Sequence, residues 1–174
     1  MPASGTGLST EIRQYLMVTG SYWAFTLTDG ALRMLIVLHF YSLGYSPISL
    51  AMLFVLYEFL GMVTNFFGGY LATKIGLNRT LHIGLGLQVL ALSLLAAPDD
   101  LSVAWVIMAQ ALSGVAKDLN KMSAKSSIKI LVHEGQPNHQ TRLYRWVAIL
   151  TGSKNTLKGV GFFLGGALLG GLGF

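Results

Sequence analysis

Long apolar segments alternate with short polar connections along this chain. Five apolar segments stand out, at about residues 15–40, 48–71, 81–97, 101–119 and 144–172. Each is close to the roughly 20 residues with which an α-helix crosses about 30 Å of hydrocarbon. The four prolines lie outside these segments, where a missing amide donor interrupts no helix. The pattern therefore predicts five membrane-spanning helices in a single transmembrane domain, residues 1–174.

Composition also indicates an integral membrane protein. Of the 174 residues, 53% are hydrophobic and only 11% are charged, and the mean hydropathy is +0.59. The first apolar segment contains Asp29 and Arg33 and is too long for the core of a cleaved signal peptide, so we expect it to be retained. The chain has no cysteine, and His133 and His139 have no further ligand nearby in the sequence. We therefore expect no metal and no cofactor.

Basic residues are unevenly distributed among the connections. The first and third connections, YSLGYSP and PDD, contain no Lys or Arg. The N-terminal segment and the second and fourth connections contain eight: Arg13, Lys74, Arg79, Lys121, Lys125, Lys129, Arg142 and Arg145. Since cytoplasmic connections are rich in Lys and Arg, we expect a plasma (inner) membrane protein with a cytoplasmic N-terminus. The net charge of +5 then reflects membrane orientation, and no nucleic acid is expected as a partner.

Seven ionisable residues lie inside the apolar segments: Asp29, Arg33, Glu58, Lys117, Asp118, Lys154 and Lys158. Facing lipid at mid-depth, at about 3 kcal/mol each, they would cost on the order of 20 kcal/mol. We therefore expect them to face one another or water. Asp29 and Arg33 are four residues apart and can pair on one helix, and Asp118 can pair with a lysine one turn away. Structural pairing and functional use are both open for Asp29 and Arg33.

Lys154 and Lys158 are the strongest candidates for ligand binding. They lie about 15 to 21 Å into their segment at a rise of about 1.5 Å per residue, too deep for both to reach the surface. The segments hold four bases and three acids, so a central cavity would prefer an anion. The predicted substrate-binding residues are Arg33, Lys117, Lys154, Lys158, Asn155, Gln110 and Tyr22, and the predicted coupling or charge-balancing residues are Asp29, Glu58 and Asp118. Lys121, Lys125 and Lys129 are interpreted as positive charge that faces anionic lipid headgroups.

Three motifs resemble those of the major facilitator superfamily. In GGYLATKIGLNR, Gly69, Lys74, Gly76 and Arg79 match the family's loop motif, whereas Thr73 and Leu77 replace an acid and a base. QALSGVA is similar to a helix-four pattern of proton-coupled members, with Gln110 and Ser113 in place of Arg and Gln. The helix-five antiporter signature is matched by Gly152, Gly161, Gly165, Gly166, Gly170 and Gly171.

In that signature Gly166 stands where proline is usual, which predicts a weaker kink. The spacing of the glycines also predicts one small-residue face against which a neighbouring helix can pack. The resemblance implies an all-α integral membrane fold with five transmembrane helices that form most of an N-terminal six-helix major facilitator half. We expect the chain to be a fragment of a twelve-span protein, whose missing C-terminal half would be a partner along with the lipid bilayer.

More narrowly, the runs TGSYWAFTLTDGALRMLIVLHF, ALSGVAKDLNKMSAKSSIK and YRWVAILTGSKNTLKGVGFFLGG resemble the organoarsenical efflux permeases of that superfamily. The resemblance implies export of 1-arseno-3-phosphoglycerate, which glyceraldehyde-3-phosphate dehydrogenase forms from arsenate, and this export would give arsenate resistance. The chain is then expected to be a transporter and not an enzyme. A small polyanion suits buried Lys and Arg, and a pentavalent oxyanion needs no thiolate. One alternative is a proton-coupled drug or small-solute antiporter that uses Glu58 and Asp29. A membrane scaffold or membrane enzyme is another, although the connections show no catalytic spacing.

Overall fold

The structure is a computed structural model that describes residues 5–97, 102–132 and 138–172. These residues form α-helices and no strand, which confirms the predicted all-α fold. The helices are α1 (Gly5–Ser42), α2 (Pro47–Met52), α3 (Val55–Ile75), α4 (Leu77–Ala96), α5 (Val103–Leu131) and α6 (His139–Leu172). His133 lies outside the described residues, and His139 begins α6.

Four of the five predicted segments correspond to one helix each. α5 continues beyond Leu119 to Leu131, so the first part of the basic connection extends this helix. The predicted segment at 48–71 is divided into two helices, because a turn at Leu53 and Phe54 separates α2 from α3. The amides of these two residues donate to carbonyls three residues earlier, at 3.3 and 3.1 Å, a tighter winding than that of an α-helix.

Local chemistry fixes several helix ends. The Ser46 hydroxyl accepts a hydrogen bond from the Ser49 amide at the start of α2, and Ser102 accepts one from the Trp105 amide at the start of α5, both at 3.3 Å. Gly76 alone joins α3 to α4, with φ at 88°. This left-handed conformation favours glycine, so the turn between α3 and α4 is itself a reason for a glycine at position 76 of the loop motif.

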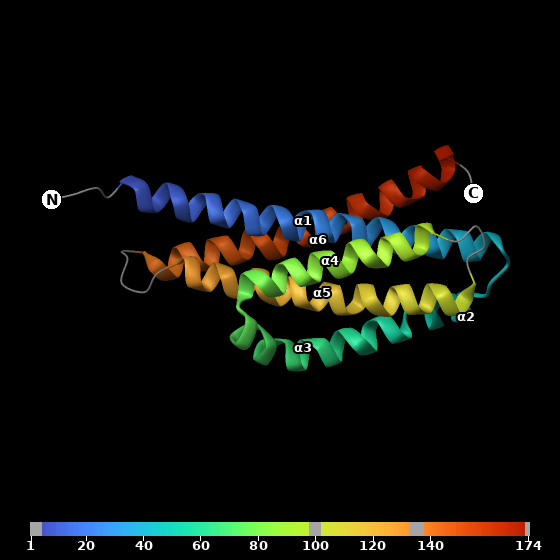
Figure 1. Ribbon diagram of the computed structural model, residues 1–174. Coiled ribbons are helices and arrows are strands. Elements are labelled where there is room, and N and C mark those ends of the chain that lie inside the picture. Colours follow the sequence, from blue (N-terminus) through green and yellow to red (C-terminus); the bar gives the residue numbers. More distant parts are fainter. Residues whose placement is uncertain (1–4, 98–101, 133–137, 173–174) are drawn as a thin grey trace.

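The helices form an elongated bundle with α5 near its centre (Figure 1). α1 packs along α6, and α5 packs against both α3 and α4 as well as against α1. The start of α1, the α3–α4 turn, the end of α5 and the start of α6 lie at one end of the bundle, on the left in Figure 1. The α1–α2 connection and the end of α4 lie at the other end. The up-and-down course therefore gathers alternate connections at opposite ends.

Two apolar clusters occupy different lengths of the bundle. The Tyr15 cluster consists of Tyr15, Tyr22, Ala124, Ile128 and Leu150. The Leu32 cluster consists of Leu32, Ile36, Phe40, Leu50, Leu53 and Val106. In the Tyr15 cluster the Tyr15 ring stacks on Trp146 with 4.4 Å between centroids, which ties α1 to α6. Along α1 the Tyr15 cluster ends at Tyr22 and the Leu32 cluster begins at Leu32, and the buried polar side chains of Thr26 and Asp29 lie between them, with apolar packing on either side.

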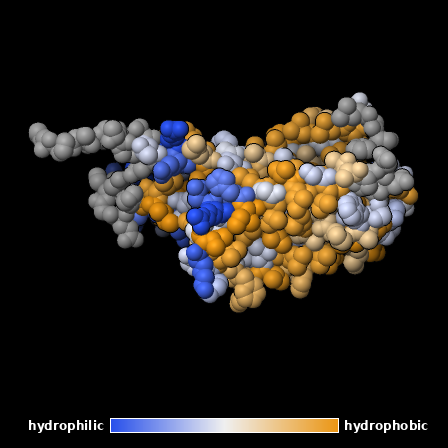
Figure 2. Space-filling model, viewed as in Figure 1, coloured by the Kyte–Doolittle hydropathy of each residue, from blue (hydrophilic) through white to orange (hydrophobic). Residues whose placement is uncertain are grey.

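Much of the outer surface is apolar. Figure 2 shows a broad hydrophobic area over most of the bundle, with hydrophilic residues gathered toward the end on the left. On α3 alone, Phe66 is 82% exposed, Met62 66% and Phe59 53%. Among the described residues, two helical stretches, Pro47–Ile75 and Leu77–Ala96, are long and apolar enough to cross a membrane.

Candidate functional site

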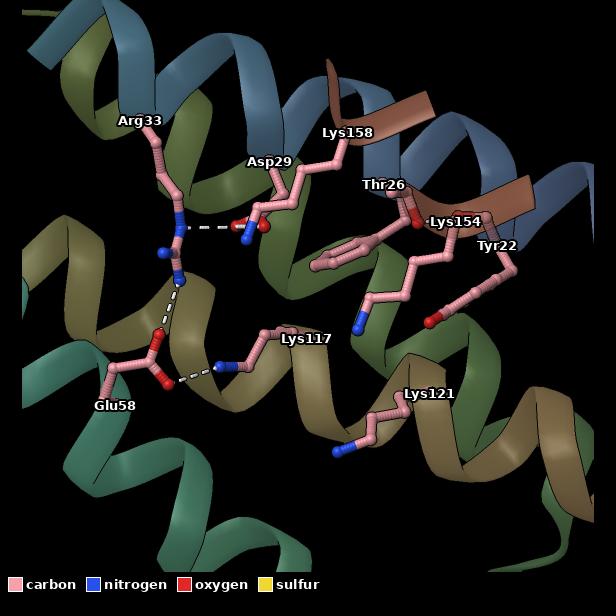
Figure 3. A pocket seen from close by; sticks show the side chains of 10 residues that line it. Tyr22, Thr26, Asp29, Arg33, Glu58, Lys117, Lys121, Lys154 and Lys158 are labelled. Carbon is pink, nitrogen blue, oxygen red and sulfur yellow. Dashed lines mark hydrogen bonds and ion pairs between the residues drawn. The ribbon is translucent and has the colours of Figure 1, made fainter. Parts of the chain in front are cut away.

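A polar cavity of about 230 Å³ lies between four helices at mid-length of the bundle. Its lining comprises Tyr22, Phe25, Thr26, Asp29 and Arg33 of α1, Glu58 of α3, Lys117 and Lys121 of α5, and Lys154 and Lys158 of α6. These residues include five bases and two carboxylates. Figure 3 shows the side chains from the four helices converging on one space.

Helical periodicity brings these side chains to the cavity. On α1 the lining positions from Tyr22 to Arg33 recur every three or four residues, so they share one face of the helix. The two lysines of α5 and the two of α6 are each four residues apart, which stacks them one turn above the other. The sequence could reveal these faces, but only the packing of the helices shows that they face one another.

Glu58 bridges two bases that belong to two other helices. Its Oε1 accepts a hydrogen bond from Arg33 Nη2 of α1 at 2.8 Å, and its Oε2 accepts one from Lys117 Nζ of α5 at 3.0 Å. The predicted pair between Asp29 and Arg33 is also present, with 3.7 Å between Oδ2 and Nε. The result is a charged network that links α1, α3 and α5 along one wall of the cavity.

Asp118 forms a second charged group next to the cavity. Its carboxylate lies 3.3 Å from Lys121 Nζ and 3.7 Å from Lys117 Nζ, so the predicted pairing with a lysine one turn away is present. Gly61 of α3 leaves room for this carboxylate, because a Cβ at that position would lie 2.5 Å from Asp118 Oδ2. Lys117 therefore has two acidic neighbours, one on its own helix and one on α3.

Tyr57 does not line the cavity, but its side chain contacts three charged residues that do. This side chain is completely buried, and its hydroxyl donates to Asp29 Oδ1 at 2.7 Å. The Arg33 guanidinium lies 4.0 Å from the ring centroid and Lys117 Nζ lies 4.3 Å from it, both within the range of cation–π attraction. The sequence analysis missed Tyr57. A buried tyrosine is expected to find a hydrogen-bond acceptor, but the sequence does not show which one.

Lys154 and Lys158 reach the cavity from α6, and Figure 3 shows both side chains extending toward its interior. Both residues are partly buried. Among the described residues neither forms an ion pair with a carboxylate, in contrast to Arg33 and Lys117. The Lys158 ammonium lies 5.6 Å from the centroid of the Phe162 ring. These two lysines thus add basic groups to the cavity that are not held in an ion pair with a described carboxylate.

Glycines set how closely α6 approaches α1. A Cβ at Gly161 would lie 2.5 Å from the Leu27 carbonyl oxygen, and one at Gly30 would lie 2.9 Å from the Lys158 carbonyl oxygen. Gly165 also packs against α1, at Ala31. This close contact brings the Lys158 backbone beside the turn of α1 that contains Asp29.

The remaining glycines of the helix-five signature do not share this interface. Gly152, Gly170 and Gly171 have open space at the Cβ position, and Gly166 would meet only the Leu38 side chain, at 3.9 Å. The predicted small-residue face therefore contacts a neighbouring helix at Gly161 and Gly165 among the six glycines of the signature. α6 continues as one helix through Gly166.

The other predicted site residues lie in different places. Gln110 is completely buried in α5 and does not line the cavity, and Asn155 is exposed on α6. Lys121, interpreted from the sequence as facing lipid headgroups, lines the cavity instead. Of the loop-motif residues, Lys74 and Arg79 are exposed beside the α3–α4 turn.

Comparison of the chain with protein-family models, with curated proteins and with solved structures found no match.

Proposed function

We propose that this chain is the substrate-binding part of a membrane transporter that carries a small organic anion. The observation that supports this most strongly is the charge of the cavity, where five bases meet two carboxylates. Two of the bases, Lys154 and Lys158, have no carboxylate partner among the described residues. Charges withdrawn from water need partners, so an excess of buried ammonium groups favours an anionic ligand.

Membrane insertion is supported by the surface of the bundle. Only 22% and 28% of the most apolar windows in Pro47–Ile75 and Leu77–Ala96 are buried, whereas a core helix of a soluble protein would be mostly covered. Large aromatic side chains such as Phe66 and Phe163 face outward. Lipid would cover such surfaces, and their extent would promote aggregation in water. We propose a plasma-membrane location on this basis.

Orientation follows from the end of the bundle at which basic residues gather. Lys74, Arg79, Lys129, Arg142 and Arg145 lie at the α3–α4 turn, the end of α5 or the start of α6, which share one end of the bundle. By the positive-inside rule this end faces the cytoplasm, together with the start of α1. The proposed arrangement is a major facilitator half whose missing helices would complete the transporter.

The substrate that we propose is 1-arseno-3-phosphoglycerate, exported to give arsenate resistance. The resemblance of the sequence to organoarsenical efflux permeases supports this identity, and the cavity is chemically suited to it. Arginine and lysine bind phosphate and arsenate oxygens through charge-assisted hydrogen bonds. Cavity bases on α1, α5 and α6 could contact more than one anionic group of the same molecule.

A drug antiporter that recognises cations is less well supported. Its recognition groups would be Asp29 and Glu58, but both carboxylates already contact bases, at 3.7 Å and 2.8 Å from Arg33. A cation entering this cavity would also meet the ammonium groups of Lys154 and Lys158, which form no ion pair with a carboxylate among the described residues.

The test is an arsenate resistance assay in arsenate-sensitive bacteria that express glyceraldehyde-3-phosphate dehydrogenase. The gene that contains this chain should confer resistance, and Lys158→Ala should abolish it while the protein remains in the membrane fraction. Lys129→Ala removes an equivalent charge from an exposed position and should leave resistance intact. Unchanged resistance in Lys158→Ala would contradict the role of this lysine, and resistance to cationic dyes in place of arsenate would favour the drug antiporter.

A further inference from the structure

We propose that Glu58 is an internal carboxylate that a bound anion displaces from Arg33 and Lys117. In the empty cavity Glu58 would occupy the place that a phosphate-like or arsenate-like group takes when the substrate binds. This inference rests on the proposed function, because it assumes that the cavity binds anions, and it adds a mechanism by which the empty cavity keeps its bases in position.

The contacts of Glu58 are those expected of an oxyanion. Its two oxygens belong to one carboxylate, and each accepts from a different base, at 2.8 Å from Arg33 Nη2 and 3.0 Å from Lys117 Nζ. A tetrahedral oxyanion also presents two oxygens on one central atom to two donors. The two bases thus form a ready-made pair of donors, which Glu58 satisfies in the absence of a ligand.

Exposure shows which partner is free to move. The Glu58 side chain is 54% exposed, whereas those of Arg33 and Lys117 are 17% and 21% exposed. Glu58 lines the polar cavity, so a half-exposed carboxylate that leaves its partners stays beside polar groups, and its release costs less than that of an enclosed charge. The two bases are more enclosed and would stay where they are.

Other contacts hold the bases in place once Glu58 has left. The centroid of the Tyr57 ring lies 4.0 Å from the Arg33 guanidinium and 4.3 Å from Lys117 Nζ. Asp29 lies 3.7 Å from Arg33, and Asp118 lies 3.7 Å from Lys117. Glu58 has no equivalent support, since its ion pairs among the described residues are those with these two bases. The carboxylate is therefore the exchangeable member of the group.

The substrate would have an advantage that Glu58 lacks. A small organic polyanion that takes the place of Glu58 can also contact Lys154 and Lys158, which line the same cavity from α6. Asp29 has a different role, because it is only 5% exposed and is held by the Tyr57 hydroxyl. We assign Asp29 as a positioning residue for Arg33 and Glu58 as a competitor of the ligand.

The experiment measures the binding of inorganic phosphate to the purified, detergent-solubilised chain by isothermal titration calorimetry in a chloride-free buffer. Glu58→Gln keeps the size of the side chain and removes its charge, and Glu58→Ala removes the group altogether. If Glu58 occupies the site in about nine of ten empty molecules, both variants should bind phosphate about tenfold more tightly than the wild type. Asp29→Asn should bind more weakly, because it loosens Arg33. Circular dichroism checks that each variant remains helical.

A charge control separates displacement from a general electrostatic effect. Asn78→Lys raises the net charge by one, as Glu58→Gln does, at an exposed position at the start of α4, and it should leave the affinity unchanged. Equal or weaker phosphate binding by both Glu58 variants, or an equal gain in Asn78→Lys, would overturn the displacement while leaving the anion site in place. If neither the wild type nor any variant binds phosphate, the proposed anion cavity itself is wrong and the displacement falls with it.

Discussion

Gly161→Ala should destabilise the chain by forcing α1 and α6 apart. The added Cβ would lie 2.5 Å from the Leu27 carbonyl oxygen and 3.1 Å from both the Ala31 amide nitrogen and the Gly30 Cα. All three atoms belong to the backbone of α1, so no side-chain rotation relieves the overlap. Ordinary contact begins at 3.4 Å, and the neighbouring carbonyl must therefore retreat by about 0.9 Å.

The expected magnitude follows from two opposing terms. Overpacking a closely fitted interface typically costs about 1 to 3 kcal/mol. Replacing glycine by alanine inside a helix contributes about 0.5 to 1 kcal/mol in the opposite direction. Gly159→Ala is the matched control, because it lies two residues away on α6 and nothing lies within 4 Å of its Cβ position. The helix-propensity term is common to both variants, so the difference between them isolates the packing cost.

The assay is thermal unfolding of both variants in the same detergent, followed by circular dichroism or scanning fluorimetry. For a chain of this size, about 1 to 3 kcal/mol corresponds to a difference of about 2 to 12 °C in Tm. We expect Gly159→Ala to unfold at or slightly above the wild-type temperature and Gly161→Ala to unfold below the control. A Tm for Gly161→Ala equal to or above that of Gly159→Ala would refute the close approach of α1 and α6 at this position.

Three further predictions test the cavity and its surroundings. Tyr57→Phe removes the donor to a buried carboxylate and should lower the free energy of unfolding by about 1 to 3 kcal/mol, measured by thermal denaturation. Lys154→Ala should weaken phosphate binding at least about tenfold in calorimetry, whereas Asn155→Ala, on an exposed position, should leave it unchanged; equal effects would contradict the assignment of the cavity face of α6. Leu150→Ala empties a completely buried position and should cost about 2 to 5 kcal/mol, whereas Leu164→Ala, which is 40% exposed, should cost clearly less in the same unfolding assay.

Helical segments were predictable from the sequence because hydrophobic length is a property of each segment alone. The turn at Leu53 and Phe54 was not, since neither proline nor glycine marks it. Leu53 is 2% exposed and belongs to the Leu32 cluster, so this turn lies within a packed core. No local pattern records that packing.

The candidate site was predictable within helices but not between them. The spacing of Asp29 and Arg33 predicted their contact, because both lie on one helix. The Glu58 bridge depends on the approach of α3 to α1 and α5, which no spacing within α3 reveals.

Gln110 was predicted to bind substrate, but it is buried away from the cavity. Gln110, Ser113 and Lys117 share a helical stripe, but α5 is surrounded by other helices and its residues meet different neighbours. The Ser113 hydroxyl donates to Gln88 of α4 at 2.7 Å, whereas Lys117 contacts Glu58 of α3 at 3.0 Å. A single stripe on a central helix can thus serve two interfaces.

The position of the cavity between the Tyr15 cluster and the Leu32 cluster also has an electrical consequence. With apolar packing on both sides of the cavity, an anion carried across a polarised membrane by the proposed transporter would pass through the full membrane potential. Each elementary charge that crosses 100 mV gains about 2.3 kcal/mol, so a dianion leaving a negative interior gains about 4.6 kcal/mol. That corresponds to a concentration ratio above about a thousandfold. Resting voltage alone would therefore be enough to drive the export of a dianion by the proposed transporter.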